Sequence, residues 1–188
     1  MSRTRTIIML GAVALAALGL FARPAAAGEF TVGAGYWDTK DADNALGVST
    51  KLTLGRWFEL RGSYFSDVTA DTSPESRDFE IKAIPVEAGV AWHFTPEDAP
   101  ASPYVGGGAS YFFLDTTAGQ IDDEVGWYAV VGSDFGRHNK LGFNVEAIYR
   151  SVDATVHENR HGLPSDVVGT THLDLSGLGA NAGLVWHF

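Results

Sequence analysis

From about residue 28 onward, apolar and polar residues alternate with a period of two. This is the spacing of β-strands, whose successive side chains point to opposite faces. In one such segment, Val125, Trp127, Ala129 and Val131 fall on a single face. The pattern predicts eight strands, each near the 9 to 11 residues that a tilted membrane strand needs. They cover approximately residues 29–37, 45–54, 58–64, 84–94, 105–113, 125–135, 141–149 and 178–188.

The two faces of these strands differ in charge. The apolar faces carry no charged residue, whereas the opposite faces carry both signs. Alternation alone does not tell which face points outward, because a soluble barrel would place its apolar face inside. In a membrane the charged faces line the lumen, since an Arg or Lys that faces lipid at mid-depth costs about 2 to 4 kcal/mol. The predicted lumenal charges are Glu29, Lys51, Glu59, Arg61, Glu87, Asp134, Glu146 and Arg150.

The N-terminal segment predicts export. Two arginines precede an uncharged apolar run at 7–22, and Ala25 to Ala27 offer small residues to a peptidase, which is the organisation of a signal peptide. A retained membrane helix is the alternative, but the run is shorter than the roughly 20 residues of a span and an Arg-Pro pair follows it. We predict a signal peptide at 1–27 and one β-barrel domain at 28–188.

The predicted mature chain is strongly acidic. Three of the 13 basic residues lie in segment 1–27, so 10 remain against 23 acidic residues, a formal charge of −13. Such a chain is a poor partner for nucleic acid, whose phosphates attract Lys and Arg. It contains no cysteine, which excludes disulfides, thiolate chemistry and a lipidated Cys. No cofactor and no metal are predicted.

The last eight residues form an alternating strand with large apolar groups on one face. The pattern of Asn181, Gly183, Trp186 and Phe188 resembles the C-terminal assembly signal of bacterial outer-membrane β-barrels. The chain is similar to the small members of that class, the OmpA transmembrane domain and OmpX-like barrels. The resemblance implies an all-β, eight-stranded antiparallel up-and-down transmembrane β-barrel in the bacterial outer membrane. The implied partners are outer-membrane lipid, lipopolysaccharide and the barrel assembly machinery, and the oligomeric state stays open.

The connections alternate in length, as in outer-membrane barrels with short periplasmic turns and longer outer loops. The predicted turns are 55–56, 95–102 and 136–140, and the predicted loops are 38–43, 69–78, 116–124 and 155–170. Aromatic residues near the turns predict a girdle at one membrane interface. These are Trp57, Trp92, Phe94, Phe135, Trp186 and Phe188.

Segments 79–94 and 173–188 resemble each other at an offset of 94 residues. In both, the apolar phase changes near residue 83 or 177, which predicts a β-bulge at each place. An ancestral duplication and the general likeness of membrane strands that run in one direction both explain the resemblance.

The lumenal charges are the main candidate site. An eight-stranded barrel is just wide enough for side chains to fill, so these groups must pair or hold water. Lys51 and Glu59 flank a turn and are candidate cross-strand neighbours, with Arg61 close by. Glu146 and Arg150 stand about 13 Å apart on one strand and need other partners. We expect a closed polar core, and a network that gates a narrow pore is the alternative.

Three further patterns suggest other chemistry. Residues 157–161, His-Glu-Asn-Arg-His, fit the HExxH motif of zinc peptidases, but the Gly-Leu-Pro that follows leaves little room for the helix that this motif needs. The predicted outer loops are acidic and could hold calcium or magnesium, although no run has EF-hand spacing and a solvated rim is favoured. Some eight-stranded outer-membrane barrels modify lipid A, and His157, His161, Ser165 and Asp166 supply residue types for such catalysis without a recognisable spacing.

The sequence therefore predicts a non-enzymatic integral outer-membrane protein with a structural or surface-interaction role. A narrow porin-like channel for small solutes and a lipid A-modifying enzyme are the alternatives.

Overall fold

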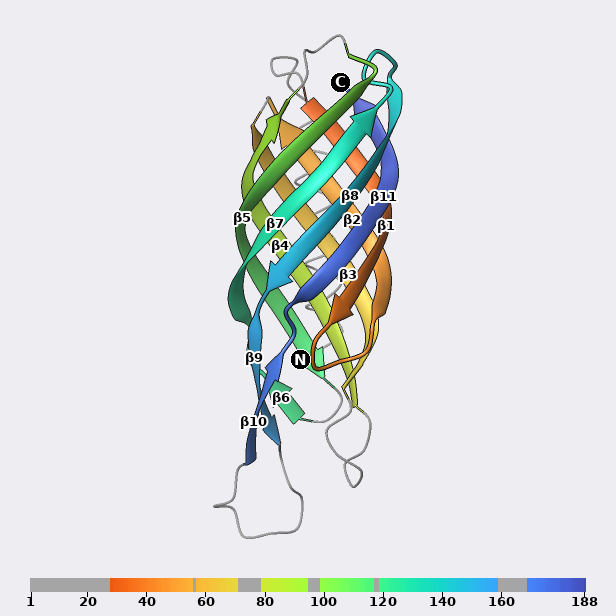
Figure 1. Cartoon of the computed structure of the whole chain (residues 1–188). Coiled ribbons are helices and arrows are strands. Elements are labelled where there is room, and N and C mark those ends of the chain that lie inside the picture. Colours follow the sequence, from red (N-terminus) through yellow and green to blue (C-terminus); the bar gives the residue numbers. More distant parts are fainter. Residues whose placement is uncertain (1–27, 56, 71–78, 95–98, 117–118, 159–168) are drawn as a thin grey trace.

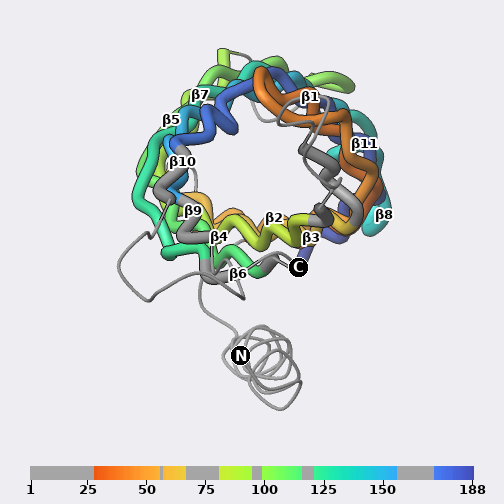
Figure 2. The backbone as a smooth tube through the Cα atoms, turned by 90° about the horizontal axis from the view of Figure 1, so that it is seen from below, coloured from red at the N-terminus to blue at the C-terminus, as the bar shows by residue number. Residues whose placement is uncertain are grey.

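The structure is a computed structural model that describes residues 28–55, 57–70, 79–94, 99–116, 119–158 and 169–188. Eight long strands close into a barrel (Figures 1 and 2). Each pairs antiparallel with the next long strand along the chain, and the first pairs with the last. This confirms the predicted eight-stranded up-and-down barrel. The strands are β1 (Gly28–Thr39), β2 (Ala45–Leu54), β3 (Phe58–Ala70), β4 (Phe79–His93), β5 (Ala101–Thr116), β7 (Glu124–Phe135), β8 (Leu141–Ser151) and β11 (Gly177–His187).

Short turns connect the strands at one end of the barrel, which we call the turn end. Gly55 and Gly136 lie in these turns with φ of 64° and 75°, in the left-handed region that suits glycine because it has no Cβ. The six aromatic side chains predicted to form a girdle are all exposed, and they belong to the strand ends and turns on this side. Within the described residues, no helix is long and apolar enough to cross a membrane.

The opposite end, the loop end, carries a second small sheet. It consists of β6 (Gly119–Ile121), β9 (Asp153–Glu158) and β10 (Gly169–Asp174), in the order β10-β9-β6, and it projects beyond the barrel (Figure 1). The prediction of a loop over 155–170 is therefore wrong at both of its ends. The β-branched residues there, Thr155-Val156 and Thr170-Thr171, favour strands and pair across the hairpin.

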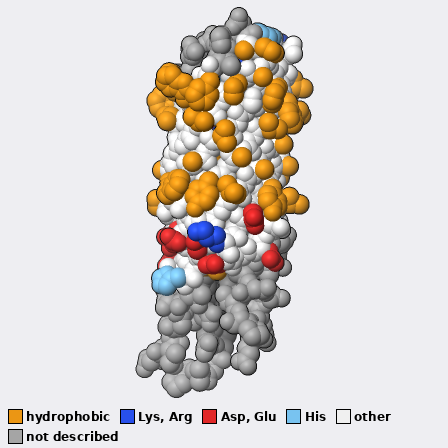
Figure 3. Space-filling view, viewed as in Figure 1, with side chains coloured by type: hydrophobic (Ala, Val, Ile, Leu, Met, Phe, Trp, Pro, Cys, Tyr) orange, Lys and Arg blue, Asp and Glu red, His pale blue; other side chains and the backbone are white. Residues whose placement is uncertain are grey.

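The faces of the barrel strands are oriented as predicted. Large apolar side chains such as Leu46, Val125 and Leu184 are exposed on the outside, and buried charged groups occupy the interior. In the space-filling view, apolar side chains cover the barrel wall, and acidic and basic side chains gather at its loop end (Figure 3). This is the distribution of a barrel whose wall contacts lipid.

The bulge predicted near residue 83 lies in the neighbouring strand. The pairing of β3 with β4 shifts register between Phe65 and Val68, opposite Ala83 and Ile81, so that β3 contains the extra residue. Strand β4 itself pairs with β5 without a shift from Ile81 onward. The bulge predicted near residue 177 is wrong, because both ladders of β11 continue without a shift from Gly177.

The changes of apolar phase have a different cause. Ile81 and Ala83 are buried inside the barrel and share the strand phase of Glu87, which is also buried. Leu173 and Leu175 are likewise buried in the phase of Asn181. The same side of each strand therefore points inward along its whole length. The side chains that line the lumen change from apolar near the loop end to polar in the middle.

Candidate functional site

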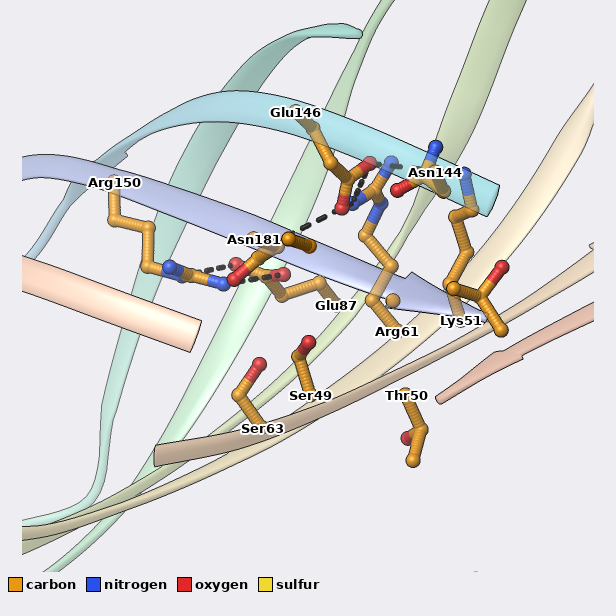
Figure 4. A pocket seen from close by; sticks show the side chains of 13 residues that line it. Ser49, Thr50, Lys51, Arg61, Ser63, Glu87, Asn144, Glu146, Arg150 and Asn181 are labelled. Carbon is orange, nitrogen blue, oxygen red and sulfur yellow. Dashed lines mark hydrogen bonds and ion pairs between the residues drawn. The ribbon is translucent and has the colours of Figure 1, made fainter. Parts of the chain in front are cut away.

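An ion-pair cluster around Arg61 and Glu146 occupies the middle of the lumen (Figure 4). Arg61 Nη1 donates to both Glu146 oxygens at 2.7 and 2.9 Å. The Nε and Nη2 atoms of Arg61 donate to Glu59 Oε2 at 3.1 and 2.7 Å. The arginine thus joins two carboxylates from β3 and β8 through charge-assisted hydrogen bonds, which are stronger than those between neutral groups.

Lys51 and Tyr104 extend this cluster toward the turn end. Lys51 Nζ donates to the Tyr104 hydroxyl at 2.9 Å and lies 3.6 Å from both Asp134 Oδ1 and Glu146 Oε2. The Tyr104 hydroxyl donates to Glu146 Oε2. Asn144 Nδ2 donates to Asp134 Oδ1 at 2.6 Å. Glu146 therefore receives donors from β3, β5 and β11, and Asp134 has partners on β4 and β8, which compensates charges that would otherwise be costly to bury.

A glycine makes room for the aromatic ring of this group. A Cβ on Gly132 would lie 2.7 Å from the Tyr104 ring, so a larger residue on β7 would displace the tyrosine. The Tyr104 ring therefore packs directly on the backbone of β7 at Gly132, which has no side chain.

Arg150 and Glu87 form a second, separate pair nearer the loop end. Arg150 Nε donates to Glu87 Oε1 at 2.8 Å, and Ser110 Oγ donates to the same oxygen at 3.3 Å. The Arg150 guanidinium also lies 5.8 Å from the centre of the Trp37 ring and 5.6 Å from that of Phe65, in cation–π range. Arg150 therefore joins the polar part of the lumen to the aromatic part.

A buried apolar cluster fills the lumen beyond Arg150, and we call it the apolar layer. Trp37 is at its base, with ring centroids 5.4 Å from Phe65 and 5.9 Å from Phe112. Strands from around the barrel and from the small sheet contribute side chains, so the layer spans the lumen. Its buried members are Trp37, Ala45, Phe65, Ile81, Ala83, Phe112, Leu114, Val152, Ala154, Leu173 and Leu175.

The connection between β1 and β2 is tied to the junction of β10 and β11 beside the apolar layer. Lys40 Nζ lies 2.7 Å from Asp174 Oδ2, and the Asp174 N–H donates to Asp41 Oδ2 at 2.9 Å. The hydrogen bond from Lys40, helped by one from Ser176, lowers the pKa of Asp174 to about 2. The same hydrogen bond raises the pKa of Lys40 above its ordinary value. Both groups are therefore ionised across the physiological range.

The turn end contains a further polar group. Arg137 Nη2 lies 3.4 Å from Glu29 Oε1, and Arg137 Nη1 donates to Ser102 Oγ at 3.0 Å. His187 Nε2 lies 3.7 Å from the same Glu29 oxygen. Nearby on the lumenal face, His93 Nε2 lies 3.3 Å from Asp134 Oδ2. The side chains of Glu29, His93, Arg137 and His187 are partly accessible, whereas Ser102 and Asp134 are buried.

Little free space remains between the two ion-pair groups. A cavity of about 10 Å³ lies among Ser49, Ser63, Arg150 and Asn181 (Figure 4), which is about the room that one water molecule needs.

The structure places seven of the predicted lumenal charges in the interior, and Glu29 lies at the turn end. Lys51 stands directly opposite Arg61 in the ladder, while its Nζ is 4.0 Å from Glu59 Oε1. Glu146 and Arg150 do have other partners, as predicted. The sequence analysis missed Tyr104, Asn144, His93 and Ser110, although their strand phase already assigns them to the polar face.

The residues predicted as an assembly signal fall on both faces of β11. Asn181 points into the lumen, where its Nδ2 donates to Glu146 Oε1 at 3.1 Å, and Gly183 lines the small cavity. Trp186 and Phe188 are exposed. Recognition of this segment by assembly machinery stays a prediction.

The other predicted chemistry lies largely outside the described residues. His157 and Glu158 end strand β9, which is not the helix that an HExxH zinc site needs, and the rest of that motif is not described. The same applies to His161, Ser165 and Asp166 of the lipid A hypothesis. Among the residues that the structure does describe, no group of three or more His, Asp or Glu side chains is arranged to hold a metal ion.

Comparison with known proteins identifies the family to which this barrel belongs. A family model described as an outer membrane protein beta-barrel domain matches residues 12–188. The chain belongs to this family. This outer-membrane barrel is accordingly a protein of the bacterial outer membrane, and the recognition made from the terminal strand and the strand pattern is confirmed. Comparison with curated proteins gives no match.

Solved outer-membrane barrels share the fold. The E. coli outer membrane protein W is 15% identical over 88% of this chain and 100% of its own, with a TM-score of 0.60. The outer membrane protein AlkL, solved in lipid bilayers, is 15% identical over 89% of this chain and 94% of its own, with a TM-score of 0.56. Neisserial surface protein A is 14% identical over 87% and 97%, with a TM-score of 0.51. At these identities the likeness shows the fold alone.

Proposed function

We propose that this outer-membrane barrel is a non-enzymatic and non-conducting protein with a structural or surface-interaction role. The observation that carries the proposal is the double filling of the lumen. The apolar layer lies at the loop end, and the ion-pair network around Arg61 and Glu146 lies behind it. A hydrated ion would have to displace both, and the cavity between the ion-pair groups has room for about one water molecule.

The two layers oppose conduction for different reasons. The apolar layer offers an ion no polar partner, so an ion there would lose its hydration without compensation. In the network, each buried charge has partners on other strands, and breaking such a pair is strongly unfavourable. The Arg150 side chain links the two layers.

The surface role is supported by the projecting sheet of β6, β9 and β10. In a barrel of this family the loop end faces outward, so this sheet, which projects beyond the barrel (Figure 1), would extend into the surroundings of the cell. A pair of strands continuous with the barrel wall is a stiffer platform than a free loop. It suits contact with molecules at the cell surface.

Planar-bilayer recording tests the proposal. We expect no conductance steps from the refolded protein. The positive control is a variant in which both layers have smaller side chains. It carries Trp37→Ala and Phe112→Ala in the apolar layer, and Arg61→Ser and Glu146→Ser in the ion-pair network. This variant should conduct, and a difference in gel mobility between boiled and unboiled samples shows that it has folded. Regular conductance steps from the unaltered protein would contradict the proposal. Mass spectrometry of lipid A from cells with and without the protein tests the enzymatic alternative, and an altered acyl pattern would favour it.

A further inference from the structure

Glu29 and His187 face each other at the turn end, outside the network that closes the lumen. They are register partners on β1 and β11, the strands whose pairing closes the barrel. Their side chains are 12% and 16% exposed, so the group is sheltered but reachable from the turn end. The shortest distance between them joins His187 Nε2 and Glu29 Oε1 at 3.7 Å, too long for a hydrogen bond.

The histidine is held in one orientation and one tautomer. Its Nδ1 lies 2.8 Å from the Asn139 carbonyl oxygen, and because a carbonyl can only accept, Nδ1 carries the hydrogen. In the neutral ring, Nε2 then presents a lone pair. This Nε2 is buried and has no hydrogen-bond partner. The ring also lies against Gly142, where a Cβ would come within 2.9 Å of the histidine Cε1.

The glutamate is held in a similar way. Its Oε1 is the oxygen nearest to Arg137, and Arg137 is itself fixed by Ser102. Its Oε2 is buried and has no hydrogen-bond partner. Two acceptor atoms of these neighbouring side chains, Glu29 Oε2 and His187 Nε2, are therefore left without a donor, whereas Glu29 Oε1 accepts a hydrogen bond from Arg137 Nη2 at 3.4 Å. Two such lone-pair groups are stabilised by a cation placed between them.

We propose that Glu29 and His187 bind one divalent transition-metal ion, for which Zn²⁺ is the natural probe. An imidazole nitrogen with one carboxylate suits zinc rather than calcium or magnesium, which prefer oxygen ligands alone. Nitrogen and oxygen ligands about 2.1 Å from a tetrahedral zinc lie roughly 3.4 Å apart, close to the separation found here. Asn139 and Arg137 occupy the supporting positions that orient metal ligands.

The site has only two protein ligands, with water to complete the coordination. Arg137 also neutralises part of the carboxylate charge. The affinity is therefore lower than that of structural zinc sites with four protein ligands. A bound ion would clamp the first strand to the last, and through Asn139 it would also fix the turn between β7 and β8. Binding would stabilise the folded barrel in proportion to the zinc concentration.

Titration of the detergent-solubilised barrel with ZnCl₂, followed by calorimetry, tests the site. The parent protein for this test carries His157→Gln, His161→Gln and His172→Gln, which removes three other histidines that could compete for zinc. We expect saturable 1:1 binding, weakened at least tenfold by either His187→Gln or Glu29→Gln. His138→Gln, which changes a histidine of the neighbouring turn, is the matched control and should leave binding unchanged.

A second measurement separates metal binding from a loss of folding. Zinc should raise the temperature at which the parent protein loses its folded gel mobility, and it should not do so in the His187→Gln variant, whose folded mobility without zinc shows that it forms the barrel. Binding that is insensitive to both substitutions would overturn the proposal. So would the absence of zinc binding together with a His187 NMR titration that reports a protonated ring paired with Glu29.

Discussion

Glu146 is the residue on which the lumenal network most depends, and Glu146→Gln is the sharpest test of that network. The carboxylate accepts two hydrogen bonds from Arg61, one from Asn181 and one from the Tyr104 hydroxyl. Lys51 Nζ lies 3.6 Å away. All of these neighbours are donors, so the NH₂ group of a glutamine would face other donors and would supply no charge to the two cations.

The expected cost follows from the burial of the cluster. Removing one partner of a buried ion pair costs about 3 to 5 kcal/mol, because the remaining charge is left uncompensated. The glutamine oxygen still accepts from Arg61, which retains part of one interaction. We therefore expect the free energy of unfolding to fall by about 3 kcal/mol, without loss of the barrel fold.

Urea unfolding of the barrel in lipid vesicles, followed by tryptophan fluorescence and by gel mobility, measures this change. Ser63→Ala is the control, since it removes a lumenal hydroxyl from β3 without touching an ion pair, and it should cost about 1 kcal/mol or less. Arg61→Met should be costly in the unaltered protein and much less so in the Glu146→Gln background, as expected for coupled residues. If Glu146→Gln costs no more than Ser63→Ala, the network does not hold the barrel closed.

Two further predictions concern the loop end and the wall. Asp174→Asn should speed tryptic cleavage after Lys40, with Asp43→Asn in the same connection as control. Because the pKa of Asp174 is lowered to about 2, its ion pair with Lys40 should be fully formed above about pH 4 and lost only as the pH falls through 2. The pair is therefore intact at pH 8, where trypsin is used. Equal cleavage of both variants at pH 8 would contradict the assignment. Gly132→Ala should lower the free energy of unfolding, since its Cβ would meet an aromatic ring at 2.7 Å, whereas Gly62→Ala, with its nearest atom at 3.5 Å, should be tolerated. The same Cβ would lie 2.8 Å from the Val145 backbone oxygen, so movement of the ring alone would not relieve the contact, and equal costs would contradict the crowding inferred at Gly132.

The strand faces could be predicted from alternation because lipid tolerates charge so poorly that the outward positions are apolar almost without exception. The identity of the lumenal charges follows from the same rule. Their pairing does not, because it depends on register across several strands. Lys51 does lie 4.0 Å from Glu59, as predicted, but its direct partner in the ladder is Arg61, and its hydrogen bond to Tyr104 comes from a strand that is not adjacent.

The apolar layer is only partly visible in the sequence. Trp37, Phe65 and Phe112 share the strand phase of the lumenal face, but alternation alone does not show that they pack into one layer. Ile81 and Leu173 also point inward, and the change of apolar phase at these residues predicts a bulge instead. The strands β9 and β10 were missed for a related reason. Outside the membrane, neither face of β9 and β10 contacts lipid, so the sequence of these strands does not alternate between apolar and polar residues. Their backbone pairing nevertheless continues.

The pairing of β9 and β10 has a mechanical consequence. Strand β9 follows β8 after the single residue Val152, whose carbonyl accepts a hydrogen bond from the Leu175 N–H at 3.1 Å, just where β10 leads into β11. At about 3.3 Å per residue, the six paired residues form a two-stranded extension roughly 20 Å long. A force applied to its tip would be transmitted through β9 and β10 to the adjacent barrel strands β8 and β11. A pulling experiment should therefore measure the mechanical resistance of the barrel wall and not the extension of a flexible linker.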